Sequence, residues 1–191
     1  MTIENEHRGM VAKLCKPGQD IIETLTPTKM HCLHMAVGIA GEAGEILDCI
    51  AIPVDVENLV EELGDIEFYM EGLRNGYDIC RDDIVATLHV NDMNITKVFP
   101  YAKNRAKDIG IAACDLLDQV KKDVIYNKEP DIGNIIQHLC ELEYHMYGLR
   151  KYYSILRDQT LSHNLEKLGV RYKNHEYSDK QAHDRADKAT A

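Results

Sequence analysis

Residues 41–65, GEAGEILDCIAIPVDVENLVEELGD, decide how this chain folds and where its chemistry lies. The stretch carries two acidic pairs, Glu42 with Glu45 and Glu62 with Asp65, each in a segment whose apolar residues recur with a helical period. Residues three apart lie on one face of a helix, so each pair projects from a single face. The sequence IPVD breaks the period between the segments, which predicts an antiparallel helical hairpin with all four carboxylates facing one space.

Four ionised carboxylates repel one another strongly at close range, so such a cluster requires a cation. An all-oxygen set of ligands suits Mg²⁺ or Mn²⁺. The alternative is a solvated acidic face, but these acids flank glycines and large apolar residues on the side that should pack. We therefore expect Glu42, Glu45, Glu62 and Asp65 to bind a divalent metal ion.

Helix signals frame this hairpin. Thr26 supplies a hydroxyl cap and Pro27 suits a first turn, so a helix is expected to start there. From caps and apolar periods we predict helices over about 28–50, 56–74 and 81–90, a connector over 91–99, and a mixed segment with a turn over 1–25. Gly38, Gly41 and Gly44 each cost a helix interior about 1 kcal/mol relative to alanine, which predicts that another helix or a ligand approaches closely there.

The chain then repeats itself. Residues 58–74 (NLVEELGDIEFYMEGLR) match residues 134–150 (NIIQHLCELEYHMYGLR), and residues 44–50 match residues 114–120. Such self-similarity predicts an internal duplication, and no strand-like alternation of useful length is present, so the expected fold class is all-α. The predicted organisation is one helical domain over 1–191, with repeat 1 over 27–90, repeat 2 over 99–168 and a basic C-terminal tail over 169–191.

The second repeat cannot rebuild the acidic site. Where the first has Glu42, Glu45, Glu61, Glu62 and Asp65, the second has Ala112, Asp115, Gln137, His138 and Glu141. It carries bases instead, in QVKKDVIYNK (119–128) and in the stretch 164–188. The lysines of the first stretch suit either an exposed helix end or phosphate contact. The second stretch is either a disordered charged terminus or a segment ordered by its tyrosines.

Composition narrows the class of protein. The net charge of −10 over 191 residues argues against general nucleic-acid binding, though not against a small phosphorylated ligand that arrives with a metal. No apolar run is long enough to span a bilayer and MTIENEHRG is too polar for a signal peptide, so we expect a cytoplasmic protein with no membrane partner. The six scattered cysteines contain no C-x-x-C and are expected to be reduced thiols.

The acidic motif resembles that of a known family. E-x-x-E, 16 residues and then E-x-x-D is similar to the signature of the all-α NTP pyrophosphohydrolases, the MazG-like superfamily. HMAVGIAGEAGEILD and VEELGDIEFYMEGLR also look like the small single-repeat MazG-like proteins of bacteria and their phages. In those, KK-x-VIYNK follows the first acidic helix and N-x-x-KL-x-x-RY…YS-x-x-QA-x-x-RADK closes the chain. Here both elements lie in the second repeat, and the resemblance covers nearly the whole chain.

The resemblance implies a set of site residues. The family's metal ligands fall on Glu42, Glu45, Glu62 and Asp65, with Glu61 as an additional acid, and Gly41 stands where some members have a further glutamate. The basic and tail positions fall on Lys121, Lys122, Tyr126, Asn127, Asn164, Lys167, Arg171, Tyr172, Arg185 and Lys188. Family members form their sites between paired subunits, which implies a fused pseudo-dimer with one composite site per chain. Such pseudo-dimers can pair again into homo-oligomers through exposed helix faces.

The implied activity is hydrolysis of a nucleoside or deoxynucleoside triphosphate to the monophosphate and pyrophosphate, with Mg²⁺ or Mn²⁺ neutralising the phosphates. Glu42, Glu45 or Glu61 would accept the proton of the attacking water, and the sequence does not choose among them. Phe68, Tyr69 and Tyr126 are candidates for stacking on the base. The alternatives are a non-catalytic nucleotide-binding or regulatory protein, and a dUTPase or phosphoribosyl-ATP pyrophosphatase of similar fold.

Overall fold

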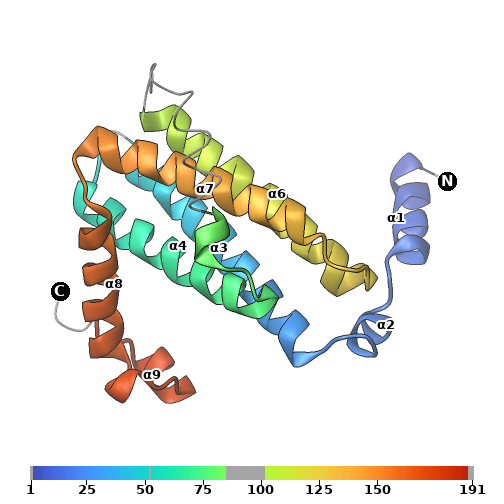
Figure 1. Ribbon diagram of the computed structural model, residues 1–191. Helices are drawn as coiled ribbons and strands as arrows, with labels where there is room; N and C mark the ends of the chain where they lie inside the picture. The colour runs from blue at the N-terminus through green and yellow to red at the C-terminus, as the bar shows by residue number, and fades with distance from the viewer. Residues whose placement is uncertain (1, 52, 85–101, 189–191) are drawn as a thin grey trace.

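The computed structural model describes residues 2–51, 53–84 and 102–188, and every regular element among them is helical. The elements are α1 (Ile3–Leu14), α2 (Gly18–Ile22), α3 (Pro27–Cys49), α4 (Val56–Tyr77), α6 (Ala102–Tyr126), α7 (Ile132–Tyr153), α8 (Arg157–Arg171), η1 (Lys173–His175) and α9 (Asp179–Asp184). Four long helices, α3, α4, α6 and α7, form a bundle, and α8 packs on α4 (Figure 1). The predicted all-α fold is confirmed for this part of the chain.

The helical hairpin forms where the local signals place it. The Thr26 hydroxyl accepts a hydrogen bond from the backbone N–H of Lys29, and Pro27 occupies the first turn of α3. The Asp55 carboxylate caps α4 by accepting from the N–H of Asn58. The two helices pack along their length, so the acidic pairs on α3 and α4 share one end of the hairpin.

Two segments were less predictable. Residues 3–14 and 18–22, expected only as a mixed region, form α1 and α2, and α1 is capped by the Thr2 side chain. Helix α1 buries none of its residues and stands apart from the bundle (Figure 1). The helix predicted over 81–90 is seen over residues 81–84; its remainder and the predicted connector lie outside the described residues.

The bundle consists of two halves whose residues correspond. The first half is α3, α4 and residues 81–84, and the second half is α6, α7 and α8. Helices α4 and α7 each have 22 residues, an aspartate that caps the N-terminus (Asp55 and Asp131), and a left-handed residue at the C-terminus (Asp78 and Ser154). All buried residues of α4 except Glu62 have a buried counterpart 76 positions later in α7, and most of those in α3 have one 70 positions later in α6.

The third helix of each half crosses to the other half. A Cβ atom added at Gly64 of α4 would lie 2.6 Å from the carbonyl oxygen of Thr160 in α8. At the corresponding place, the Cys140 thiol of α7 lies 3.7 Å from the carbonyl oxygen of Ile84. Helix α8 thus rests on the first half as residues 81–84 rest on the second.

The glycine-based expectation is right at one of its three positions. Gly38 lies directly against the ring of Tyr69, which leaves no room for a Cβ atom. Gly41 and Gly44 have no atom of the described residues within 4 Å of such a Cβ and lie on the exposed side of α3, so no described helix approaches them, and the approach of a ligand stays a prediction. A costly helix residue marks a contact only where the helix face is covered, and the sequence does not show which face that is.

The remaining composition-based expectations concern cysteines and membranes. All six cysteines are free thiols, and Cys32, Cys49 and Cys140 are buried in the core. Within the described ranges, the helices are all too short or too polar to cross a bilayer.

Candidate functional site

Helices α3 and α4 bring three carboxylates together. Oxygen atoms of Glu42, Glu62 and Asp65 all lie within 4.8 Å of one another, and we call these residues the acidic cluster. Glu62 is buried at 5 % exposure, whereas Glu42 and Asp65 are partly exposed. Glu45 is exposed one turn beyond Glu42 and contributes repulsion to both Glu42 and Glu62. The four predicted metal ligands therefore share one place, three of them in close proximity.

The carboxylates of the acidic cluster perturb one another. Burial, together with the hydrogen bond to Glu42 and the charge of Glu45, raises the pKa of Glu62 from 4.5 to about 8. Burial also raises the pKa of Glu42, against the hydrogen bond from Glu62, and the charges of Asp65 and Glu45 raise it further. Because both pKa values are raised, Glu42 and Glu62 ionise together readily only beside a bound cation. An all-carboxylate set of this kind fits Mg²⁺ or Mn²⁺.

Helix α8 adds bases and an amide from the second half. The Asn164 side-chain amide donates to Asp65 over 2.7 Å. The ammonium group of Lys167 contacts both Glu61, at 3.1 Å, and Asp65. Beyond α9 the chain returns to the cluster, where Lys188 donates to Glu61 over 3.1 Å. The expected meeting of acids from the first half with side chains from the second is thus seen for the bases Lys167 and Lys188 and for the amide of Asn164.

These contacts fix the charge of their partners. Burial raises the pKa of Glu61, but the hydrogen bonds from Lys167 and Lys188 outweigh it and leave the pKa below its usual value. Burial lowers the pKa of Lys167, yet hydrogen bonds to Asp65 and Glu61 leave it raised. Lys167 is therefore a charged ammonium group at only 8 % exposure, held at the edge of the acidic cluster.

A pocket of about 540 Å³ adjoins Asp65 between α3, α4, α8 and the C-terminal segment. Aromatic rings dominate its wall, and we call it the aromatic pocket. Its lining includes His34, Phe68, Tyr69, Asn164, Arg171, Tyr172, His175 and Tyr177. Of the predicted base-stacking residues, Phe68 and Tyr69 lie here, with their rings edge to face at 5.4 Å.

The C-terminal segment closes one side of the aromatic pocket. The Arg171 guanidinium forms two hydrogen bonds with Asp187, at 2.7 and 2.6 Å, which tie the chain after α9 to α8. The rings of Tyr172 and Tyr177 lie 5.7 Å apart in the pocket wall. Arg185 is the left-handed C-cap of α9 and is exposed. The stretch 164–188 is therefore ordered, as its tyrosines suggested.

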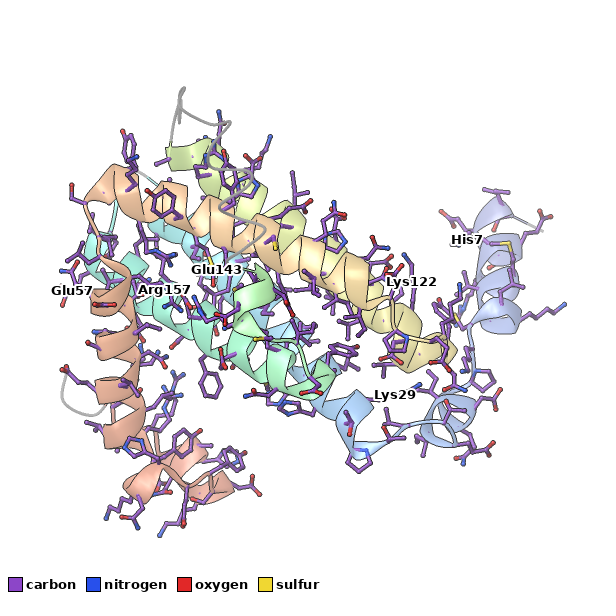
Figure 2. All side chains as sticks on the ribbon, viewed as in Figure 1. His7, Lys29, Glu57, Lys122, Glu143 and Arg157 are labelled. Atoms are coloured by element: carbon purple, nitrogen blue, oxygen red, sulfur yellow. The ribbon has the colours of Figure 1, made fainter. Side chains whose placement is uncertain are left out.

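The structure does not bring the bases of α6 to the acidic cluster. Helices α3 and α6 run antiparallel, with Lys29 beside Asp123 and Leu47 beside Gly110. Lys122 therefore lies opposite the start of α3, at the end of the bundle near α1 and α2 (Figure 2). Glu42 is almost four helical turns further along α3, which is about 20 Å.

Each predicted base on α6 has other contacts. Lys121 and Lys122 are exposed and both bind Asp118, at 2.7 and 2.9 Å. The Asn127 side chain accepts a hydrogen bond from Lys29 over 2.7 Å, and Tyr126 is exposed. Their role in substrate binding stays a prediction. Within one chain, no contact between the described residues links them to the acidic cluster.

Some pocket residues carried no clear signal in the sequence. His34 shares a helical line with Gly38 and Glu42, but a single histidine in such a position is more often a packed core residue. His175 and Tyr177 lie in a segment with two left-handed residues, whose path no periodicity predicts. Only the return of the chain along α8 places these rings beside Phe68 and Tyr69.

The corresponding place in the second half is filled differently. Gln137 donates to Glu141 over 3.0 Å and His138 lies 3.3 Å from Glu141, while Ala112 replaces Glu42. Among the residues that the structure describes, the acidic cluster of the first half is the one group arranged to hold a metal ion. Where the first half has Gly38 and Tyr69, the second has Asp108 and His145, 3.9 Å apart.

The geometry defines a carboxylate cluster bordered by a buried ammonium group and an aromatic pocket. A scan against family models and searches of curated proteins and of solved structures found no match to this chain. The assignment of a function therefore depends on the residues themselves.

Proposed function

We propose that this protein hydrolyses a nucleoside or deoxynucleoside triphosphate to the monophosphate and pyrophosphate, using Mg²⁺ or Mn²⁺. One observation carries the proposal: the acidic cluster, the ammonium group of Lys167 and the aromatic pocket adjoin one another at Asp65. A metal-bound triphosphate needs carboxylates for the metal, a cation for the phosphates and an apolar, aromatic space for the base. The three parts meet at Asp65, which belongs to the acidic cluster, is bound by Lys167 and lines the aromatic pocket.

We infer further that the chain is a fused pseudo-dimer of two MazG-like helical units. The matching caps, lengths and buried positions of α4 and α7 support this, as does the crossing of α8 onto α4. The second unit lacks the acids at the positions of Glu42 and Glu62, which favours one composite site per chain. Exposed helix faces leave room for pairing of two such chains.

The residues of the acidic cluster, the adjoining bases and the aromatic pocket would each have a role in this reaction. Glu42, Glu45, Glu62 and Asp65 would hold the divalent ion, which supplies charge neutralisation at the phosphates and at the attacking water. Lys167, Lys188 and Arg171 would bind the phosphate oxygens, with Asn164 orienting Asp65. Phe68, Tyr69 and Tyr172 would enclose the base and exclude water from it.

The surroundings of these carboxylates bear on the choice of proton acceptor. Lys167 and Lys188 hold the pKa of Glu61 below its usual value despite its burial, which makes Glu61 a weaker base than an unperturbed glutamate. Burial raises the pKa of Glu42, and Glu45 is exposed to solvent at the rim of the cluster. We therefore favour Glu42 or Glu45 over Glu61 as the group that takes the proton from water.

A pyrophosphate-release assay tests the proposal. The common ribonucleoside and deoxyribonucleoside triphosphates would be supplied with Mg²⁺ or Mn²⁺ to the wild type and to Glu62→Gln. We expect release from one or a few nucleotides, and loss of at least about 100-fold in the variant, because a neutral amide weakens the metal site. Release from dUTP alone would identify a dUTPase-like member of the same superfamily.

The competing class is a non-catalytic nucleotide-binding or regulatory protein. Such a protein would release no pyrophosphate from any nucleotide in the assay, while the wild type still bound nucleotides with Mg²⁺ in a calorimetric titration. Glu62→Gln would then keep much of that affinity, because the bases and the aromatic pocket remain. Absence of both turnover and binding would contradict both the pyrophosphohydrolase and the nucleotide-binding hypothesis.

A further inference from the structure

A network of six charged residues joins the two halves. It comprises Glu67, Arg74 and Arg81 from the first half and Glu143, Arg150 and Arg157 from the second, each 76 positions from its counterpart. We call it the ion network. Figure 2 shows Glu143 and Arg157 within the bundle, toward the end away from Lys29 and Lys122.

The pairing within the ion network is reciprocal. Glu67 accepts hydrogen bonds from Arg150, at 3.1 Å, and from Arg157, at 2.7 and 2.5 Å. The counterpart carboxylate Glu143 lies 3.2 Å from Arg81, and 4.0 Å from Arg74. Each glutamate is thus bound by arginines of the other half, as expected for two units related by approximate twofold symmetry.

Burial makes these contacts obligatory. Glu67 is 2 % exposed and Glu143 is 4 % exposed. An ionised carboxylate at such depth is tolerated only with close partners of opposite charge, because its hydration is lost. Arg157 supplies the two-pronged contact that a planar guanidinium makes with a carboxylate, which fixes both distance and direction. The start of α8 is therefore held in one position relative to α4.

The position of the start of α8 determines where the other residues on the same face of this helix lie. Arg157, Thr160, Asn164, Lys167 and Arg171 recur every three or four residues, so they share one side of the helix. Thr160 is fully buried against Gly64, and the next two residues of the stripe bind Asp65. A helix is stiff over this length, about 15 Å from Arg157 to Lys167.

We propose that Arg157 is a positioning residue: by binding Glu67 across the two halves, it sets α8 in the register that places Asn164 and Lys167 against the acidic cluster. Its effect on turnover rests on the proposed function, whereas its effect on α8 does not. The chain contains a control at the corresponding position, Arg81. This residue donates one hydrogen bond to Glu143 over 3.2 Å, on the side where the acids are replaced, and lies 3.9 Å from Glu67. The exposures of the two side chains also match, at 33 % for Arg157 and 35 % for Arg81.

The test compares Arg157→Met with Arg81→Met. Methionine keeps the length of the side chain and removes the charge, and in each variant the glutamate retains another arginine. Three kinds of measurement would be made at temperatures below the melting range of both variants. They are hydrogen exchange of the α8 amides, binding of inorganic tripolyphosphate with Mg²⁺ by calorimetry, and kcat and KM for the nucleotide that the pyrophosphate-release assay selects. Arg157→Lys serves as the conservative variant, keeping the charge without the two-pronged contact.

We expect both methionine variants to lose similar thermal stability. Only Arg157→Met should accelerate exchange in α8, weaken tripolyphosphate binding by about tenfold and lower kcat/KM by about 10- to 100-fold, since small displacements of positioned groups have large effects on rate. Arg157→Lys should recover part of each loss. A purely structural role predicts equal effects of the two methionine variants on binding and rate.

The outcomes separate the inference from the proposed function. Unchanged exchange of α8 in Arg157→Met would overturn the positioning role whatever the activity. Faster exchange in a protein whose wild type neither binds tripolyphosphate nor turns over nucleotides would uphold the positioning of α8 and overturn the proposed function. Turnover in the wild type with equal rate losses in both variants would overturn the inference and leave the proposed function intact.

Discussion

Glu62 is the residue at which the chemistry of the site and the stability of the fold oppose each other. It is buried among like charges, so in the absence of a cation it retains a proton at neutral pH. A helix core would be more stable with a neutral side chain there, and a retained glutamate at such a position is the usual sign of a functional group. The proton on Glu62 makes the stability of the folded protein depend on pH.

The metal-free protein should lose stability as the pH rises from about 4.5 to about 8. The folded state holds a proton on Glu62 up to about pH 8, while the unfolded chain releases it near 4.5. The folded state therefore binds more protons in this window, and its advantage is complete at the lower pH and lost at the higher. Thermal unfolding followed at several pH values checks this. Added Mg²⁺ or Mn²⁺ should reduce the change of melting temperature with pH.

Glu62→Gln isolates the group responsible. The amide is neutral at every pH, so the variant should melt about 2–4 °C above the metal-free wild type at pH 8, which corresponds to about 1 kcal/mol, and should lack much of the slope. Glu166→Gln, an exposed position on α8, is the matched control and should leave the slope unchanged. A variant that melts at the wild-type temperature at pH 8 would contradict the assignment of the strain to Glu62.

Lys167 should compete with the metal and assist the substrate. Its ammonium group neutralises Glu61 and Asp65 in the absence of other cations. Lys167→Met should therefore bind Mn²⁺ alone about fivefold more tightly, while the KM for the nucleotide rises at least about tenfold because a phosphate contact is lost. Lys188→Met, at a half-exposed position, should show both effects more weakly. Weaker Mn²⁺ binding by Lys167→Met would show that Lys167 organises the acids instead of competing for them.

Among the helices, the contact between α4 and α8 is the one that brings Asn164 and Lys167 to the acidic cluster. The sequence predicts α3 and α4 well, because caps such as Thr26 and Asp55 and the apolar period act over a few residues. Local patterns do not predict that α8 docks on α4, because Asn164 and Asp65 are 99 positions apart, and only the family resemblance implied that the two residues share a site. The repeat indicated two similar units, but left open which face of each would be covered.

Two glycines separate covered faces from open ones. An alanine at Gly64 would place its Cβ against the Thr160 carbonyl, so α8 must move, at a cost of about 1–3 kcal/mol. An alanine at Gly44 meets nothing and should stabilise α3 by about 1 kcal/mol. Denaturant unfolding of both variants measures the difference. A Gly64→Ala protein as stable as Gly44→Ala would mean that α8 does not lie against α4 in solution.

For the whole molecule, the question is which parts of the second half serve the site of the first. Helix α8 packs on α4, and α6 packs antiparallel to α3. The bases of α8 are thereby near the acidic cluster, while the last turns of α6, with Lys122, lie at the far end of α3 (Figure 2). The sequence contains both sets of bases, but only the packing of the halves shows that one set lies beside the acidic cluster of the same chain.

The double variant Lys121→Ala/Lys122→Ala tests this division. Both side chains are exposed and bind only Asp118 among the contacts that the described residues show, so the variant should fold normally and change KM by less than about twofold. Lys167→Met provides the contrast within the same assay. A loss in the double variant as large as that in Lys167→Met would mean that these lysines reach an acidic cluster in another molecule. The kinetic defect would then depend on protein concentration, and sedimentation would detect the dimer, because a site completed between two chains exists only while they are associated.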